Sequence, residues 1–186
     1  MIYLCSDWHL NHNRTFIYEV RGFKSVNEMN AEIVRRHNAI VKPEDDVYCL
    51  GDCCMGTDLE ANKKLIESLN GKIHIILGNH CHASPRRVAM YQQCRNVVEI
   101  VASAMIKLGK QQFYLSHWPT ITSNNDADKP LAARIINLCG HLHTYDPWTD
   151  IDKGLIYHVE MEAHNCSPVL LDDILQEFKD KEAWLK

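Results

Sequence analysis

The sequence lacks long apolar runs and blocks of like charge. Its 186 residues carry 20 Lys and Arg against 24 Asp and Glu, which gives a net charge of -4 with the histidines neutral. No segment approaches the roughly 18 consecutive apolar residues that a membrane-spanning helix needs. The charges are dispersed, which argues against a general surface for nucleic acid or membrane. We therefore expect no membrane partner, and nucleic acid only as a substrate.

A CxxC pair is also missing, although the chain contains eight cysteines. Structural zinc sites usually take at least two thiolates from such a close pair, so a structural zinc site is disfavoured. The first residues, MIYLCSDWHL, have no basic segment and do not resemble a signal peptide. We expect a cytoplasmic protein with reduced thiols in place of disulfides.

Short runs rich in Ile, Val, Leu and Tyr are present and predict β-strands. They cover residues 2–5, 47–50, 73–77, 97–101, 113–115, 135–139 and 155–159. Helical patterns lie between several of them and alternate with the strands. This alternation predicts an α/β layered fold, and the length predicts one domain over residues 1–186.

Four segments carry signals for the start or end of a helix. Ser25 and Glu28 form a capping-box signature for a helix over 25–41. A second helix is expected over 58–69, ending before Asn-Gly. Two more, beginning at 84 and 167, each place Ser at the N-cap and Pro at the first helical position. Residues 123–130 are expected to be a mobile loop.

Five of the predicted strands are followed directly by residues that can bind metal ions. These residues are Ser6-Asp7-Trp8-His9, Gly51-Asp52, Gly78-Asn79-His80, Ser116-His117 and Gly140-His141-Leu142-His143. Ligands of α/β folds bind beyond the carboxyl ends of strands, so these side chains are expected to converge. Each motif alone has an ordinary alternative, such as a turn, a solvated strand end or a core histidine. Their joint occurrence in this order favours a shared site.

In order, the motifs read DxH, GD, GNH, H and GHxH, and they cover residues 7–143. This series resembles the calcineurin-like metallophosphoesterases. SDWHLNHN and VYCLGD resemble the small single-domain bacterial and phage-type members of that superfamily. The resemblance implies a four-layer sandwich, in which two mixed β-sheets are flanked by helices, and a dinuclear metal centre. One metal ion would be bound by Asp7, His9, Asp52 and His143, and the other by Asp52, Asn79, His117 and His141.

The same resemblance implies hydrolysis of phosphodiesters, with phosphomonoesters as the alternative, by attack of a metal-bridging hydroxide on phosphorus. Nitrogen and oxygen ligands without thiolate suit two divalent transition metal ions. Manganese is the first choice, with iron, zinc, cobalt and nickel as alternatives. His80 would be the catalytic residue that stabilises or protonates the leaving oxygen. Cys81 stands where most relatives have an acidic residue, and from this we expect a weaker acid and a preference for good leaving groups.

Several other residues are candidate substrate contacts for a small phosphate ester or a nucleotide. Asn11 and His12 closely follow the DxH motif, and the alternative for them is a solvated loop. Arg21 is a candidate by charge type, and the alternative for it is a surface salt bridge. Arg14, Arg134, Trp118 and Trp148 are candidates by side-chain type only. A catalytically weak metal- or phosphate-binding module is the alternative function. A P-loop is excluded because Thr57 stands where Lys is required. The oligomeric state is left open.

Overall fold

The computed structural model describes residues 1–122 and 128–181 and has two β-sheets at its centre. The first sheet has the strand order β4-β3-β2-β1-β9. Its strands are β1 (Ile2–Cys5), β2 (Asp46–Cys49), β3 (Lys72–Ile76), β4 (Val97–Val101) and β9 (Val169–Leu170). The strands β1 to β4 are parallel, and β9 is antiparallel to β1.

The second sheet has the order β5-β6-β7-β8. Its strands are β5 (Ala104–Leu108), β6 (Gln111–Leu115), β7 (Ile135–Cys139) and β8 (Ile156–His158). The strands β5 and β6 are antiparallel, whereas β6, β7 and β8 are parallel. A short 3₁₀ turn, η1 (Leu131–Ala133), precedes β7. Both sheets are therefore mixed, as expected.

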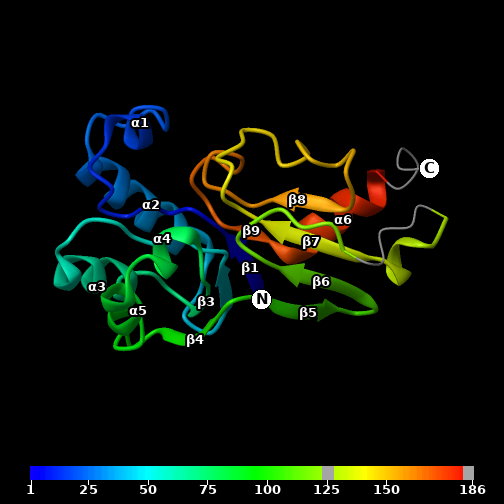
Figure 1. The fold of residues 1–186 in the computed structure, drawn as a ribbon, viewed down its shortest axis with the longest axis horizontal. Coiled ribbons are helices and arrows are strands. Elements are labelled where there is room, and N and C mark those ends of the chain that lie inside the picture. The colour runs from blue at the N-terminus through cyan, green and yellow to red at the C-terminus, as the bar shows by residue number, and fades with distance from the viewer. Residues whose placement is uncertain (123–127, 182–186) are drawn as a thin grey trace.

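Helices flank the sheets (Figure 1). They are α1 (Thr15–Tyr18), α2 (Val26–Ile40), α3 (Leu59–Glu67), α4 (Asn79–His82), α5 (Pro85–Tyr91) and α6 (Leu171–Lys181). The Ser25 hydroxyl accepts from the Glu28 amide, which confirms the predicted cap of α2, and the Asp58 carboxylate caps α3 by accepting from the Ala61 amide. Pro85 is the first residue of α5, which also agrees with the prediction.

Two apolar clusters follow from the alternation of side chains along the strands. In β1, Tyr3 and Cys5 pack into a cluster with residues of α2, α3 and α5, whereas Leu4 points to the other face. There Leu4 meets Phe113 and Leu138 of the second sheet, and residues of α6 complete the cluster. The second cluster thus joins the two sheets. In the second sheet, β6, β7 and β8 point toward the first sheet, and β5 runs in the opposite direction (Figure 1).

Several elements differ from the sequence prediction, among them the short elements α1, α4 and β9, which were not predicted. The helix expected from Ser167 begins only at Leu171, because Val169 and Leu170 are extended and pair with Leu4 and Tyr3 of β1. Strand β5 was not predicted, since its sequence AMIKL has only one β-branched residue. Part of the predicted mobile loop, residues 123–127, lies outside the described residues. Within residues 1–122 and 128–181, no helix is both long and apolar enough to cross a bilayer.

Candidate metal centre

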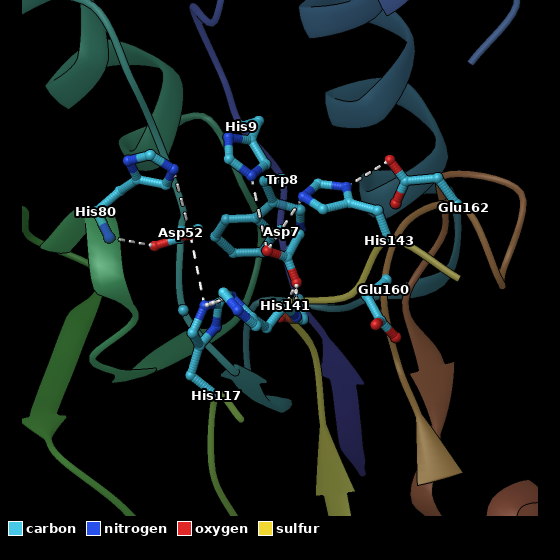
Figure 2. A network of polar contacts seen from close by, with 12 residues as sticks. Asp7, Trp8, His9, Asp52, His80, His117, His141, His143, Glu160 and Glu162 are labelled. Atoms are coloured by element: carbon cyan, nitrogen blue, oxygen red, sulfur yellow. Dashed lines mark hydrogen bonds and ion pairs between the residues drawn. The ribbon is translucent and has the colours of Figure 1, made fainter. Parts of the chain in front are cut away.

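All seven predicted ligands follow the carboxyl ends of strands from the two sheets. Figure 2 labels all of them except Asn79. Asp7 and His9 follow β1, Asp52 follows β2, and Asn79 follows β3 as the first residue of α4. The second sheet supplies the remaining three, His117 after β6 and His141 and His143 after β7. Main-chain hydrogen bonds hold these loops together: the Asp7 amide donates to the Gly51 carbonyl and the His9 amide to the Asp52 carbonyl.

One group of side chains gathers around Asp7. Its Oδ1 is 3.6 Å from Nε2 of His9 and 3.7 Å from Nε2 of His143. The rings of His9 and His143 have centroids 4.9 Å apart. Asp7 and His9 are buried, and the other carboxylate oxygen of Asp7 accepts from the His141 amide at 2.8 Å. The free oxygen and the two imidazole nitrogens therefore face one small space.

A second group gathers around His117. Its Nε2 is 2.8 Å from Oδ1 of Asn79, 3.2 Å from Nδ1 of His141 and 3.5 Å from Oδ2 of Asp52. The same Asn79 oxygen is 3.0 Å from Nδ1 of His141. Ligand atoms of Asp7, Asp52 and His117 all lie within 4.8 Å of one another, which joins the two groups. The structure thus brings together every residue of both predicted ligand sets.

The backbone at these positions is strained. Asp7, His9, Asp52, His141 and His143 have positive φ angles of 56°, 49°, 50°, 79° and 52°. Such angles are uncommon for residues other than glycine and cost about 1–3 kcal/mol each. Among the described residues, only three further non-glycine positions share this conformation. Strain of this kind is retained at functional sites, so its concentration here marks the cluster as one.

The polar atoms of the first group fit a cation. Oδ1 of Asp7 and Nε2 of His9 are buried and have no hydrogen-bond partner within the described part of the chain. Buried polar atoms without partners are rare, and a bound ion is one explanation for them. Burial alone would raise the pKa of Asp7, but the surrounding histidines reverse this and hold its pKa below the usual range. Asp7 is therefore an anion.

The protonation states of the imidazoles also suit the binding of a metal ion. Burial lowers the pKa values of His9 and His141, and it lowers that of His12 to about 4. These rings are neutral at pH 7, which is the form that binds metal ions. His143 differs: burial lowers its pKa, but the hydrogen bond to Glu162 and the charges of Asp7 and Glu162 together outweigh burial and raise the pKa. A cation near Asp7 would compete with that proton.

Glu162 is a functional residue that sequence reasoning missed. Its Oε1 accepts from Nδ1 of His143 at 2.8 Å and from the Arg21 guanidinium at 2.8 and 2.9 Å (Figure 2). Arg21 also donates to the main-chain carbonyls of Asp7 and Trp8. The pair therefore ties the DxH loop to His143. Glu162 belongs to none of the motifs, but it follows β8 by four residues, as His9 follows β1 and His143 follows β7, so the end of the strand predicted over 155–159 was the signal that could have pointed to it.

His80 lies at the edge of the cluster. Its amide donates to Oδ1 of Asp52, its Nε2 is 3.9 Å from Oδ2 of Asp52, and its side chain is 40% exposed. Cys81 points away from His80 into the core, where it is buried, and its nearest titrating neighbour is Cys53. Thus Cys81 does not face His80, and Asp52 is the carboxylate that does.

The structure corrects two of the three predicted substrate contacts. The Arg21 guanidinium is buried and engaged as described above, so it is not free to bind substrate. The side-chain amide of Asn11 is also engaged: it donates to Asn62 and accepts from Asn30. These bonds hold the loop after the DxH motif against α2 and α3. His12 keeps its predicted place, since it lines a cavity with His9 and His80.

Three further candidates had been chosen by side-chain type, and only one of them lies beside the cluster. Arg134 is buried at the start of β7, at the opposite end of the strand from the cluster, so it is not a phosphate contact. Trp148 packs edge-on against Tyr157 and Phe178 in the core and does not stack on a substrate. Trp118 is exposed beside His141, with ring centroids 6.1 Å apart.

The chain belongs to the calcineurin-like phosphoesterase family, whose sequence profile matches residues 1–183. Members are hydrolases that use divalent metal ions. An uncharacterized protein of Methanocaldococcus jannaschii, MJ1445, is 41% identical over 177 residues, which cover 94% of this chain and 89% of that protein. The Gene 66 protein of Mycobacterium phage L5 is 26% identical over 159 residues and 76% of each chain.

A solved structure supports the fold. The crystal structure of AQ665, a protein of unknown function from Aquifex aeolicus, superposes with a TM-score of 0.71 at 19% identity. The match covers 95% of this chain and 98% of that chain. The predicted α/β arrangement of two mixed sheets flanked by helices is confirmed.

Proposed function

We propose that this protein is a dinuclear phosphoric ester hydrolase that acts on phosphodiesters, with phosphomonoesters as weaker substrates. The main support is the meeting of seven ligand-type side chains from five strand ends in one cluster. Asp7, His9, Asp52 and His143 would hold one divalent ion, and Asp52, Asn79, His117 and His141 the other. Manganese is our first choice, before iron, zinc, cobalt and nickel.

The charge of the ligand set supports a phosphate ester as substrate. When bound, two divalent ions would supply Lewis-acid charge to the phosphate oxygens and an activated water at neutral pH. Only two of the seven ligands, Asp7 and Asp52, are carboxylates, so the loaded cluster keeps a net positive charge. Ligand atoms of Asp52 lie within 4.8 Å of those of Asp7 and His117, and we expect Asp52 to be shared by both ions. A phosphate ester would therefore be attracted to this end of an otherwise acidic protein.

His80 would act as the general acid. It is exposed to the cavity and its imidazole can reach a leaving oxygen above the cluster. Oδ2 of Asp52 lies 3.9 Å from its Nε2, and position 81 carries a cysteine in place of an acidic residue. Alkyl leaving oxygens need protonation more than aryl ones. His80→Ala should therefore slow an alkyl diester more than an aryl diester, measured as kcat/KM; equal slowing would remove this role from His80.

The proposed activity is tested on metal-reconstituted protein with bis-p-nitrophenyl phosphate and p-nitrophenyl phosphate in the presence of Mn²⁺. We expect turnover of the diester to exceed that of the monoester. Asp52→Asn should abolish turnover and reduce bound metal below two ions per chain. Full turnover of that variant with two ions would contradict the shared role of Asp52. Wild-type protein that binds metal but turns over no ester would be a binding module instead.

Two more proposals concern the setting of the site. Ligands from both sheets meet in one cluster, which supports residues 1–186 as one functional domain. All eight cysteines are free thiols, and all are buried. Free thiols are typical of a reducing compartment, which supports action in the cytoplasm on a small phosphate ester or a nucleotide.

A further inference from the structure

A recess of about 380 Å³ opens directly beside the cluster. The proposed ligands His9 and His143, together with His80, line it on one side. Phe16 of α1, Val20 and Tyr145 line it on the other. Because the two sides share one space, any phosphate held at the cluster would have this recess as a neighbour. The volume lies within the range of small-molecule sites, roughly 300–1,000 Å³.

The far wall of the recess is apolar and open to solvent. Phe16, Val20 and Tyr145 are 64%, 52% and 66% exposed. They make up three of the ten large hydrophobic side chains exposed in the described part of the chain. Single exposed hydrophobic residues need no explanation, but a group that borders a cavity marks a binding surface. The Tyr145 hydroxyl donates to the Val20 carbonyl at 3.5 Å, so the two segments of the wall are joined.

The recess offers no site for a second phosphate. Over the described residues, neither lysine nor arginine lines it. Its one carboxylate, Glu162, is 2% exposed and already paired with Arg21 and His143. An occupant of the recess is therefore uncharged. The rings of Phe16, His12 and Tyr145 favour a planar aromatic group, since aromatic rings pack well face-to-face with an offset or edge-to-face.

We propose that this recess binds an uncharged aromatic substituent of the phosphate ester, an aryl or heteroaromatic ring, while the phosphate lies at the cluster. This specificity rests on the proposed phosphoesterase function, because it places the substituent relative to the phosphate. Phe16 and Tyr145 are then specificity-determining residues. They contact the substituent and not the reacting phosphorus.

Binding of two phosphonates to the metal-loaded protein tests this directly. Phenylphosphonate and methylphosphonate share the anionic group and differ in the substituent on phosphorus, which is a phenyl ring in one and a methyl group in the other. We expect calorimetry to show about tenfold tighter binding of phenylphosphonate, as burial of a ring predicts. Phe16→Ala and Tyr145→Ala should remove most of this preference and leave methylphosphonate affinity and metal content unchanged. Met105→Ala, which truncates another exposed hydrophobic side chain, on β5 and outside the recess, should keep the preference.

The outcomes separate the two proposals. Equal affinity of wild-type protein for both phosphonates, or an unchanged preference in both alanine variants, would overturn the aromatic recess while ester hydrolysis stands. Failure of metal-loaded protein to bind either phosphonate would overturn both. Since Phe16 and Tyr145 are exposed, their variants should fold, and an unchanged melting temperature checks this. A larger preference for a nucleoside phosphonate than for phenylphosphonate would identify the ring as a nucleobase.

Discussion

At the scale of single residues, the imidazole of His143 shows how a neighbour can prepare a ligand. Glu162 accepts from Nδ1 of this ring, which leaves Nε2 directed toward Asp7. A carboxylate behind a ligating histidine fixes its tautomer and orientation and increases its basicity. Arg21 neutralises Glu162 and holds it in place. We therefore expect Glu162 to act as a positioning residue for one of the two ions.

Glu162→Gln should weaken binding of that ion by about tenfold to a hundredfold, because the neutral amide supports the imidazole less well. Metal analysis after dialysis should find close to one ion per chain in the variant and two in the wild type. Glu99→Gln is the matched control, since Glu99 is exposed and its carboxylate likewise accepts from a histidine, His74, on the surface of the first sheet. Two tightly held ions in Glu162→Gln would contradict the positioning role.

At the scale of elements, the glycines before the ligands explain why the motifs read GD, GN and GH. A Cβ at Gly51 would lie 2.4 Å from Nδ1 of His117, and one at Gly78 would lie 2.4 Å from Oδ1 of Asp52. The strand ends approach so closely that only glycine fits between them. The glycines therefore serve the packing of the cluster as well as the turns.

Gly140, at the end of β7, gives the clearest test of this packing. A Cβ there would lie 1.9 Å from Oγ of Ser6 and 2.4 Å from Oδ2 of Asp7. We expect Gly140→Ala to destabilise the fold by about 1–3 kcal/mol through overpacking and to lower metal content. Urea unfolding and metal analysis measure the two effects.

Gly109→Ala is the matched control, because a Cβ at Gly109 meets nothing within 4 Å. Gly109 has a positive φ of 59°, so alanine at this position should lower the free energy of unfolding only by the cost of that backbone conformation. The variant should keep its metal. Equal metal loss in both variants would argue against a packing role for Gly140.

At the scale of the whole molecule, the cluster joins the two sheets. Four of the proposed ligands follow strands of the first sheet: Asp7, His9, Asp52 and Asn79. The other three, His117, His141 and His143, follow strands of the second sheet. Bound ions would therefore stabilise the contact between the sheets as well as the loops. The apolar cluster shared by both sheets holds the same contact without metal.

Chelation should accordingly lower the melting temperature without unfolding the protein at room temperature. At free metal about a hundredfold above the dissociation constant, binding contributes about 2.7 kcal/mol. For a chain of this length, that corresponds to roughly 5–11 °C. Thermal melts with EDTA and with Mn²⁺ measure the difference. Asp52→Asn should show a smaller shift, and identical melts of the wild type under both conditions would contradict metal binding at the cluster.

Local patterns in the sequence were enough for most strands and for the convergence of the ligands. Apolar runs end where polar motifs begin, and parallel strands place those ends at one edge, as Asp7 and Asp52 show. The helix start at residue 167 was wrong because Ser-Pro is a local signal, whereas the pairing of Leu170 with Tyr3 is a long-range contact. Side-chain direction was also beyond the sequence: Asn11 and Arg21 are close to the motif but turn away from the cavity.

The sequence by itself determined which residue types end the strands and in what order, since each motif is a continuous stretch of chain. Tertiary structure alone decided that Glu162 supports His143, that Arg21 is buried and that an apolar wall faces the cluster. These features join segments more than a hundred residues apart or loops without regular structure. The physical reason is that such contacts depend on how the two sheets pack, and no local pattern of residues encodes that packing.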